Sequence, residues 1–226
     1  MPHTTTTVST TSLATRLLDM HDQLATMLPA DVLSALDAYA ERLGREDYPA
    51  ALRAGRTAPK FVLPDHRGEA VSLEALLAAG PVVVAFYRGQ WCPYCNTQLH
   101  AYQEMLPEFS ARRAQLVAIS PQTPDNSLTT VERHALAFPV LVDAGSRVAD
   151  QFGIALSIEG AMRDLHAGVG ADLSAINGDS SWRVPVPATY VISQDGLIAA
   201  DWIDGDFRHR AEPAEILAAL DAIRTR

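Results

Sequence analysis

The chain has few cysteines, almost no lysine and no long apolar run. In 226 residues it holds two cysteines and one lysine, Lys60. The net charge of −9 and the scatter of the arginines argue against the basic patch that contacts phosphates, so we expect no nucleic-acid partner. The longest apolar stretches, such as residues 81–87, have the length of a strand and fall far short of the ~20 residues of a membrane helix, so we expect no membrane association.

The first residues show neither a basic region followed by an apolar run nor a signal-cleavage pattern, which favours a cytoplasmic protein. Thiols stay reduced in that compartment. A chain of this length also buries enough apolar surface to fold without disulfide cross-links. The two cysteines therefore indicate chemistry rather than structural cross-linking.

Both cysteines lie in the segment WCPYC, as Cys92 and Cys95. A zinc site would need a second pair of ligands at matching spacing, but there is no further cysteine and the histidines are dispersed, so we expect no metal and no other cofactor. Two inert buried cysteines are the other alternative, although chance seldom leaves the only two thiols three residues apart. The spacing favours a redox-active pair.

The chain divides into a tail, a helical segment and a larger domain. Residues 1–12 are rich in Thr and Ser without periodicity, which predicts a disordered tail. Apolar residues spaced three and four apart, interrupted at Pro29, predict an N-terminal helical hairpin within 13–54. The pattern leaves open whether the hairpin packs on its own domain or forms a homodimer contact. Residues 55–226 then form one domain with an insertion at about 154–186.

The larger domain alternates strand and helix patterns, which predicts an α/β fold with a central mixed β-sheet flanked by helices. The dipeptide Asp195-Gly196 separates two apolar segments and predicts an antiparallel hairpin. Strands are predicted within 58–65, 81–88, 115–120, 138–143, 188–193 and 197–203, and helices within 71–80, 96–113 and 127–137 and from about Pro213. The segment 146–186 reads as a long loop with one helical piece, which indicates a functional or poorly ordered region.

The cysteines follow a buried strand and begin a predicted helix. Cys92 then lies near the helix N-cap and Cys95 one turn further on, with side chains about 5 to 6 Å apart, which suits a disulfide. The helix N-terminus stabilises a thiolate and lowers its pKa. Pro93 suits the first helical turn, and Trp91 is expected to shield one side of the sulfur.

Segments in order along residues 55 to 220 resemble the peroxiredoxin-like family, the alkyl hydroperoxide reductase and thiol-specific antioxidant group, in its CxxC-containing branch within the thioredoxin superfamily. They are APKFVLPD, FYRGQWCPYC, QLVAISPQTPD, FPVLVD and VPATYVISQDG. The resemblance implies a thioredoxin-like fold. It also implies a thiol peroxidase that reduces hydrogen peroxide or organic hydroperoxides and is recycled by a thioredoxin-type dithiol donor.

The family motif places a Pro, a Thr or Ser and the peroxidatic cysteine at fixed spacing. On this sequence it puts the peroxidatic position at Cys95, the Thr position at Cys92 and the Pro position at Arg88. The family's distant arginine falls on Pro187. Loss of the Thr and Arg donors argues against fast turnover, although Arg88 can replace the missing charge. Tyr87, at the end of the same strand, is a further supporting residue.

WCPYC is also similar to the thioredoxin and glutaredoxin signature, which implies a second hypothesis. A thiol-disulfide oxidoreductase would use Cys92 as the attacking thiol and Cys95 to release the product. Pro187 then resembles the cis-proline that thioredoxins place beside their CxxC, the alternative being an ordinary trans proline before a strand.

A third hypothesis is a redox-sensing binding module whose hairpin carries a partner. The segment 154–186, particularly Trp182 and Arg183, is expected to cover the site.

Overall fold

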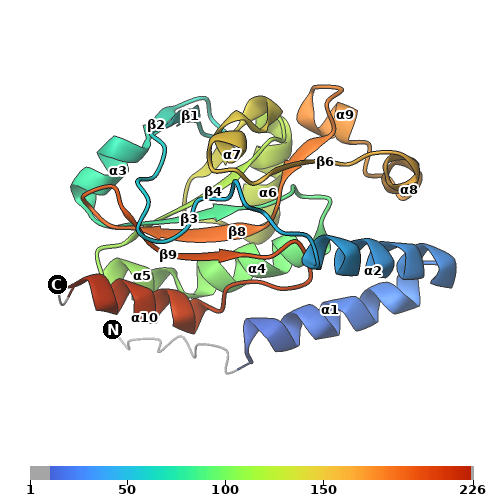
Figure 1. Ribbon diagram of the computed structural model, residues 1–226, viewed down its shortest axis with the longest axis horizontal. Coiled ribbons are helices and arrows are strands. Elements are labelled where there is room, and N and C mark those ends of the chain that lie inside the picture. Colours follow the sequence, from blue (N-terminus) through green and yellow to red (C-terminus); the bar gives the residue numbers. More distant parts are fainter. Residues whose placement is uncertain (1–10, 225–226) are drawn as a thin grey trace, which may run out of the picture.

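The computed structural model describes residues 11–224 and has a five-stranded sheet at its centre, in the order β5-β4-β3-β8-β9 (Figure 1). Strands β3, β4 and β5 are parallel, whereas β8 runs antiparallel to β3 and β9 antiparallel to β8. The predicted mixed sheet and the hairpin at Asp195-Gly196 are therefore confirmed. The strands are β3 Val82–Phe86, β4 Gln115–Ser120, β5 Val140–Val142, β8 Ala188–Ile192 and β9 Ile198–Ile203.

Helices cover both faces of the sheet, which explains why β3 is apolar at every position and buried throughout. One face packs on α4 (Pro93–Glu104) and α10 (Pro213–Arg224), and α5 (Leu106–Ala111) lies against β4 on the same side. The other face packs on α3 (Leu73–Ala79) and α7 (Arg147–Gln151). Helix α6 (Pro124–His134) packs beside α4. The sheet is thus the middle layer of three.

The predicted helix over 96–113 is two helices, α4 and α5. The break falls at Met105, whose backbone leaves the helical region. Pro107 explains it, because proline lacks an N–H and is tolerated in the first turn of a new helix but not inside an old one.

The helical hairpin forms as predicted, as α1 (Leu13–Met27) and α2 (Ala30–Gly44). Leu13, Leu17 and Leu43 join the same buried cluster as the sheet and α4, so the hairpin packs on its own domain. The domain boundary between residues 54 and 55 stays a prediction. The predicted disordered tail lies, apart from residues 11 and 12, outside the described residues.

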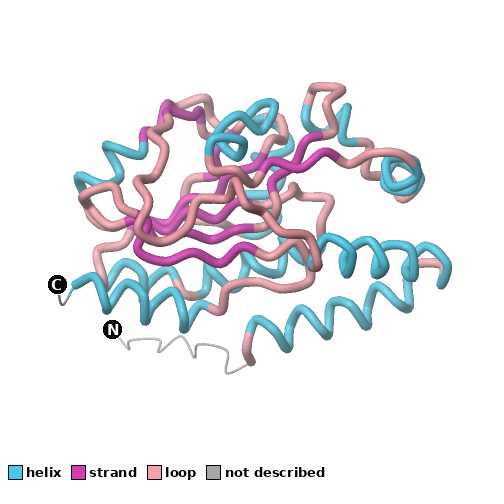
Figure 2. The backbone as a smooth tube through the Cα atoms, in the orientation of Figure 1, coloured by secondary structure: helices cyan, strands magenta, loops and turns pink. Residues whose placement is uncertain are grey.

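The segment expected to be a long loop carries regular structure of its own (Figure 2). Ile158, Leu173, Trp182 and Val184 form a small separate core with Trp91 packed against it. These few apolar residues, spread over a polar glycine-rich sequence, give no periodic signal.

The remaining short elements lie both inside and outside this segment. They are β1 Val62–Pro64, β2 Ala70–Ser72, the 3-10 turn Ala144–Ser146, β6 Ala155–Ser157, α8 Ala161–Gly168, α9 Leu173–Asn177 and β7 Arg183–Pro185.

No helix within residues 11–224 is long and apolar enough to span a membrane.

Candidate active site

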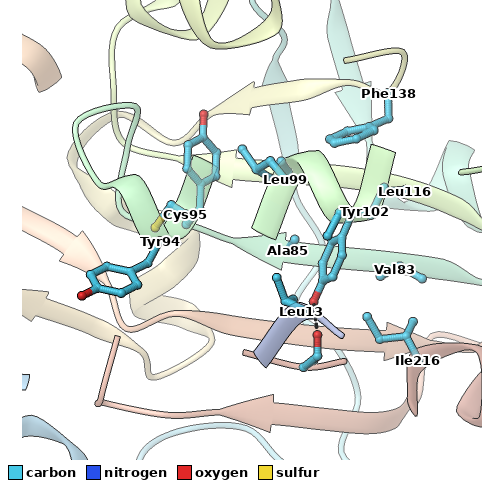
Figure 3. Close-up of a cluster of buried hydrophobic side chains, with 14 of the residues drawn as sticks. Leu13, Val83, Ala85, Tyr94, Cys95, Leu99, Tyr102, Leu116, Phe138 and Ile216 are labelled. Carbon is cyan, nitrogen blue, oxygen red and sulfur yellow. Dashed lines mark hydrogen bonds between the residues drawn. The ribbon is translucent and has the colours of Figure 1, made fainter. Parts of the chain in front are cut away.

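The two cysteines occupy the start of α4, directly after the central strand β3. Cys92 is the N-cap residue with an extended backbone, Pro93 is the first helical residue, and the Cys95 N–H donates to the Cys92 carbonyl at 3.1 Å. Figure 3 shows Cys95 at this end of α4, with the Tyr94 side chain extending away from the helix. Both cysteines are free thiols, and their exposed fractions are 2% for Cys92 and 0% for Cys95. The predicted strand–turn–helix position is confirmed.

Three groups surround the Cys95 sulfur. The Arg88 backbone N–H donates to it at 3.5 Å and the Arg210 guanidinium at 3.4 Å, and the Cys92 thiol forms a hydrogen bond to it. Burial alone would raise the pKa of Cys95, but these hydrogen bonds and the charges of Arg210 and Arg88 outweigh it and lower the pKa to about 5. Burial and the neighbouring Cys95 raise the pKa of Cys92. These contacts therefore favour the thiolate on Cys95 and the protonated thiol on Cys92 at neutral pH.

Arg210 is held in place by groups on α4 and on its own loop. Its Nε donates to the Gln98 side-chain oxygen at 2.8 Å, and its Nη1 donates to the carbonyl of Phe207. Gln98 in turn donates to Tyr102 at 3.1 Å and to Thr189 at 3.3 Å, both in the core. Sequence reasoning missed Arg210. The only sequence signal is the run of basic residues 208–210 between the last strand and the last helix, which does not indicate which of them reaches the thiols.

The Arg88 side chain points inward, which the sequence left undecided. It packs between two aromatic rings, with the guanidinium carbon 4.6 Å from the Trp91 ring and 4.2 Å from the Phe207 ring. Its Nη2 lies 3.3 Å from His166 Nε2, and His166 Nδ1 lies 2.7 Å from the Met162 carbonyl. Because a carbonyl only accepts, Nδ1 carries the hydrogen and Nε2 accepts from Arg88. Burial and the Arg88 charge lower the pKa of His166 to about 4, so its ring is neutral.

The other predicted supporting residues lie around this group. Tyr87 is buried, its hydroxyl accepts from the Gln122 side chain at 2.9 Å, and burial raises its pKa. Trp91 packs edge-on against His166 with ring centroids 5.2 Å apart and so covers Arg88. Sequence reasoning missed His166, because nothing local connects it to the cysteines.

Pro187 does not have the backbone geometry expected from the thioredoxin signature. No peptide bond within residues 11–224 is cis, so the interpretation of Pro187 as a cis-proline is wrong. It follows the ordinary trans preference of X–Pro bonds. Pro187 lines a different cavity, beside Thr189 and Arg210, and its carbonyl accepts from the Asp204 N–H at 3.3 Å.

The insertion contributes to the site through α8 and not through the two residues that the sequence singled out. The Trp182 indole donates to Ser174 at 2.7 Å inside the insertion's own core, and Arg183 pairs with Asp150. It is His166, on α8, that reaches Arg88. The role of 154–186 as a cover stays a prediction.

A cavity of about 410 Å³ lies over the cysteine pair. Cys92 and Arg88 are part of its lining, whereas Cys95 is fully buried and is not. The hairpin contributes Leu28 to the lining, and α8 and its C-cap contribute His166 and Val169. A small molecule therefore approaches the pair from the Cys92 side.

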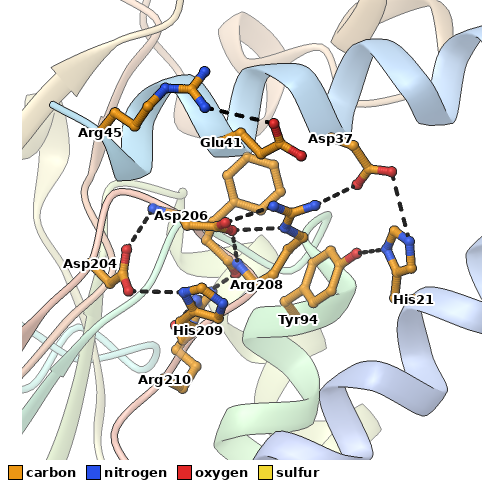
Figure 4. A network of polar contacts seen from close by, with 11 residues as sticks. His21, Asp37, Glu41, Arg45, Tyr94, Asp204, Asp206, Arg208, His209 and Arg210 are labelled. Atoms are coloured by element: carbon orange, nitrogen blue, oxygen red, sulfur yellow. Dashed lines mark hydrogen bonds and ion pairs between the residues drawn. The ribbon is translucent and has the colours of Figure 1, made fainter.

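A polar network ties the cysteine turn to the hairpin and to the C-terminal loop (Figure 4). Tyr94 Oη lies 2.9 Å from His21 Nδ1 on α1. Arg208 bridges Asp206 in the loop and Asp37 on α2, at 2.7 Å and 3.0 Å. The loop that presents Phe207 and Arg210 is thereby anchored to the hairpin.

Within residues 11–224, no group of three or more His, Cys, Asp or Glu side chains is arranged to hold a metal ion.

Residues 54–201 match the sequence model of the AhpC/TSA family. The chain belongs to the AhpC/TSA family. A protein of Mycobacterium tuberculosis named as a peroxiredoxin, Rv1608c, is 30% identical over 174 residues, which cover 77% of this chain and 99% of the relative. The thiol-disulfide oxidoreductase ResA of Halalkalibacterium halodurans is 32% identical over 103 residues, or 45% of this chain and 57% of the relative.

Solved structures agree with this assignment. The crystal structure of peroxidoxin BcpB from Mycobacterium tuberculosis is similar with a TM-score of 0.61 and 26% identity, over 76% of this chain and 99% of that one. A yeast mitochondrial 1-Cys peroxiredoxin shares the fold at a TM-score of 0.60 and 16% identity, over 77% of each chain. The thioredoxin-like fold and the family resemblance are confirmed. The AhpC/TSA match leaves out the hairpin and the loop that carries Phe207 and Arg210.

Proposed function

We propose that this AhpC/TSA protein is a thiol peroxidase that reduces hydrogen peroxide or organic hydroperoxides, with Cys95 as the peroxidatic cysteine and Cys92 as the resolving one. The observation that carries the assignment of roles is the set of donors around Cys95, which includes the Arg210 guanidinium at 3.4 Å from the sulfur. A thiolate is the nucleophilic form of cysteine, and these donors favour it at Cys95. Arg210 supplies a positive charge in place of the family's arginine, whose position is occupied by Pro187 in this chain.

The reaction then proceeds in two steps. The Cys95 thiolate attacks the terminal oxygen of the hydroperoxide, the O–O bond breaks, and Cys95 becomes a sulfenic acid while the alkoxide leaves with the electron pair. The Cys92 thiol, hydrogen-bonded to Cys95, is placed to give its proton to that alkoxide. The resulting Cys92 thiolate attacks the Cys95 sulfur, displaces hydroxide and closes a disulfide. The hydroxide combines with the proton that Cys95 had released to solvent on ionisation, and leaves as water.

Regeneration requires two electrons from outside. A thioredoxin-type dithiol reduces the disulfide by exchange and returns both thiols. The position of Cys92 in the cavity wall supports attack at the Cys92 sulfur of the disulfide. The cytoplasm, where such reductants are kept reduced, is the proposed compartment, and homodimer formation stays a prediction.

One observation favours a second candidate function, a thiol-disulfide oxidoreductase. Cys92 lines the cavity whereas the fully buried Cys95 does not, and a thiol that attacks a bulky substrate disulfide must face the substrate. The partial similarity to ResA agrees with this alternative. The same two residues would then act in the opposite order.

The experiment that separates the two is a stopped-flow mix of the reduced protein with hydrogen peroxide, followed by tryptophan fluorescence. The peroxidase predicts a rate far above that of an ordinary free thiol, lost in Cys95→Ser. It also predicts that Cys92→Ser still consumes peroxide and gives a sulfenic acid that dimedone traps. A rate no better than a free thiol's, with Cys92→Ser inactive in disulfide exchange and Cys95→Ser accumulating mixed disulfides, would establish the oxidoreductase instead.

A further inference from the structure

Arg88 is a buried cation without an acidic partner in the described part of the chain. Its exposed fraction is 3%, and the ion pairs found among residues 11–224 all involve other cations. The neutral ring of His166 is the hydrogen-bond partner of its guanidinium. Buried arginines are ordinarily paired with an anion, because a lone charge removed from water is costly. The site therefore has room for one further negative charge.

The Cys95 thiolate does not fill this role by direct contact. It is the Arg210 guanidinium that hydrogen-bonds the sulfur, at 3.4 Å, whereas Arg88 contacts the same sulfur with its backbone N–H, at 3.5 Å. The charge of Arg88 lowers the pKa of Cys95 through space, and its effect is smaller than that of the Arg210 charge. The thiolate thus has its own counter-ion, and the Arg88 side chain lies in the wall of the cavity.

The rest of that cavity combines apolar residues with the side chains of Gln90, Asn96, Arg133 and His166. Its hairpin wall is made of Leu24, Leu28 and Leu36, with Val169 and Phe207 on other sides. The three leucines belong to α1, α2 and their connection, outside the residues that match the AhpC/TSA family. A largely apolar lining with a few polar groups, among which Arg88 is the buried cation, is typical of a site for a small molecule of matching character. Hydrogen peroxide uses none of these contacts.

We propose that the cavity binds an apolar carboxylic acid, with the carboxylate on Arg88 and the hydrocarbon part against the hairpin leucines, and that hydroperoxides of such acids are the preferred substrates. The guanidinium fork matches a carboxylate in a planar, charge-assisted pair. The second half of this inference rests on the proposed peroxidase function. The first half, binding of an unreactive acid, does not.

The binding test is calorimetric titration of the reduced wild-type protein with decanoate and with its neutral analogue decanamide. Decanoate should bind about tenfold or more tightly, because a hydrogen-bonded charge pair to Arg88 is present in that complex alone. Equal affinity for the two molecules overturns the proposal. This comparison needs no variant, so it stands whatever a substitution does to folding.

Variants then locate the two parts of the ligand. Arg88→Gln should remove the preference for decanoate over decanamide, and Leu28→Ala should weaken both by about tenfold. The matched control is Met27→Ala, because Met27 is the neighbour of Leu28 on the chain, is 75% exposed and does not line the cavity. A preference that survives Arg88→Gln, or a Met27→Ala loss equal to that of Leu28→Ala, contradicts the assignment.

Turnover separates this inference from the proposed function. The ratio of kcat/KM for linoleic acid hydroperoxide to that for its methyl ester should exceed about tenfold in the wild type and fall toward one in Arg88→Gln. Reduction of hydrogen peroxide without any such preference refutes the acid site alone. Binding of decanoate by a protein that consumes no peroxide refutes the peroxidase alone.

Discussion

The guanidinium of Arg210 lies 3.4 Å from the sulfur of Cys95, although 115 residues separate the two along the chain. The contact forms because the loop between β9 and α10 returns to the start of α4, where Gln98 accepts a hydrogen bond from Arg210. Arg210 lies outside the AhpC/TSA match. The chain thus provides from its C-terminal loop a charge that the family motif places elsewhere.

Replacing Arg210 should slow the attack on peroxide. Arg210→Gln removes a charged donor from the thiolate, and the loss of one such donor costs about a hundredfold in rate. Stopped-flow oxidation of the reduced variant measures this loss, and the ultraviolet absorbance of the thiolate should show a raised Cys95 pKa. The control is Arg183→Gln, because Arg183 pairs with Asp150 and leaves the cysteines untouched. An unchanged rate in Arg210→Gln would exclude Arg210 from the reaction.

The rate at which peroxide oxidises Cys95 should change with pH in the acidic range and be constant above it. The thiolate is the reactive form, and the Arg210 and Cys92 contacts lower the pKa of Cys95 to about 5. The rate should therefore rise as the pH increases through that value and stay level toward about pH 8, where an ordinary thiol, with a pKa of about 8.5, is still largely protonated. Stopped-flow measurements across this range provide the profile. A midpoint near that of a free cysteine would contradict the thiolate assignment.

Neighbouring leucines on α1 should differ sharply in their contribution to stability. Leu17 is 4% exposed and belongs to the core of the sheet, so Leu17→Ala should cost about 2–5 kcal/mol. Leu18 is 66% exposed, and Leu18→Ala should stay within about 0.5 kcal/mol. Urea unfolding measures both. One cooperative transition is expected, because hairpin and sheet share a core; earlier unfolding of the hairpin alone would show two separate domains.

Gly89 should not tolerate a side chain. Its φ is +140°, and a Cβ would come within 2.6 Å of Trp91 Nε1. Gly89→Ala should therefore shift the tryptophan fluorescence of the folded protein and slow its oxidation. The control is Gly196→Ala, since Gly196 also has a positive φ, of +84°, but open space around it. That variant should lose about 1 kcal/mol of stability and keep the fluorescence. Identical spectra for the two variants would contradict a role of Gly89 in placing Trp91.

The parts of the site that the sequence could predict are those determined by neighbours in the chain. An apolar run, a Cys-Pro dipeptide and a second cysteine three residues on are enough to place Cys92 at an N-cap and Cys95 in the first turn. The hairpin was predictable for the same reason, because its leucines repeat with the period of a helix. Local spacing was thus enough to predict the position of the two cysteines at the start of a helix and the two helices of the hairpin.

The groups that set the charge of the site come from distant segments and were not predictable. Arg210 reaches Cys95 because the loop between β9 and α10 folds back over α4, and His166 reaches Arg88 from α8. Neither residue carries a motif. Pro187 shows the opposite case, in which a similar motif predicted a backbone geometry that the chain does not adopt. Tertiary contacts decide such positions, and a single sequence does not encode them by spacing.

The charge balance around Cys95 also bears on the oxidised protein. When the sulfurs join, the negative charge beside Arg210 disappears while the guanidinium groups of Arg210 and Arg88 remain. Electrostatics then favour the dithiol over the disulfide, which raises the reduction potential of the couple. The disulfide formed in each turnover is accordingly readily reduced. The arginines that activate Cys95 for attack on the peroxide therefore also favour regeneration of the dithiol.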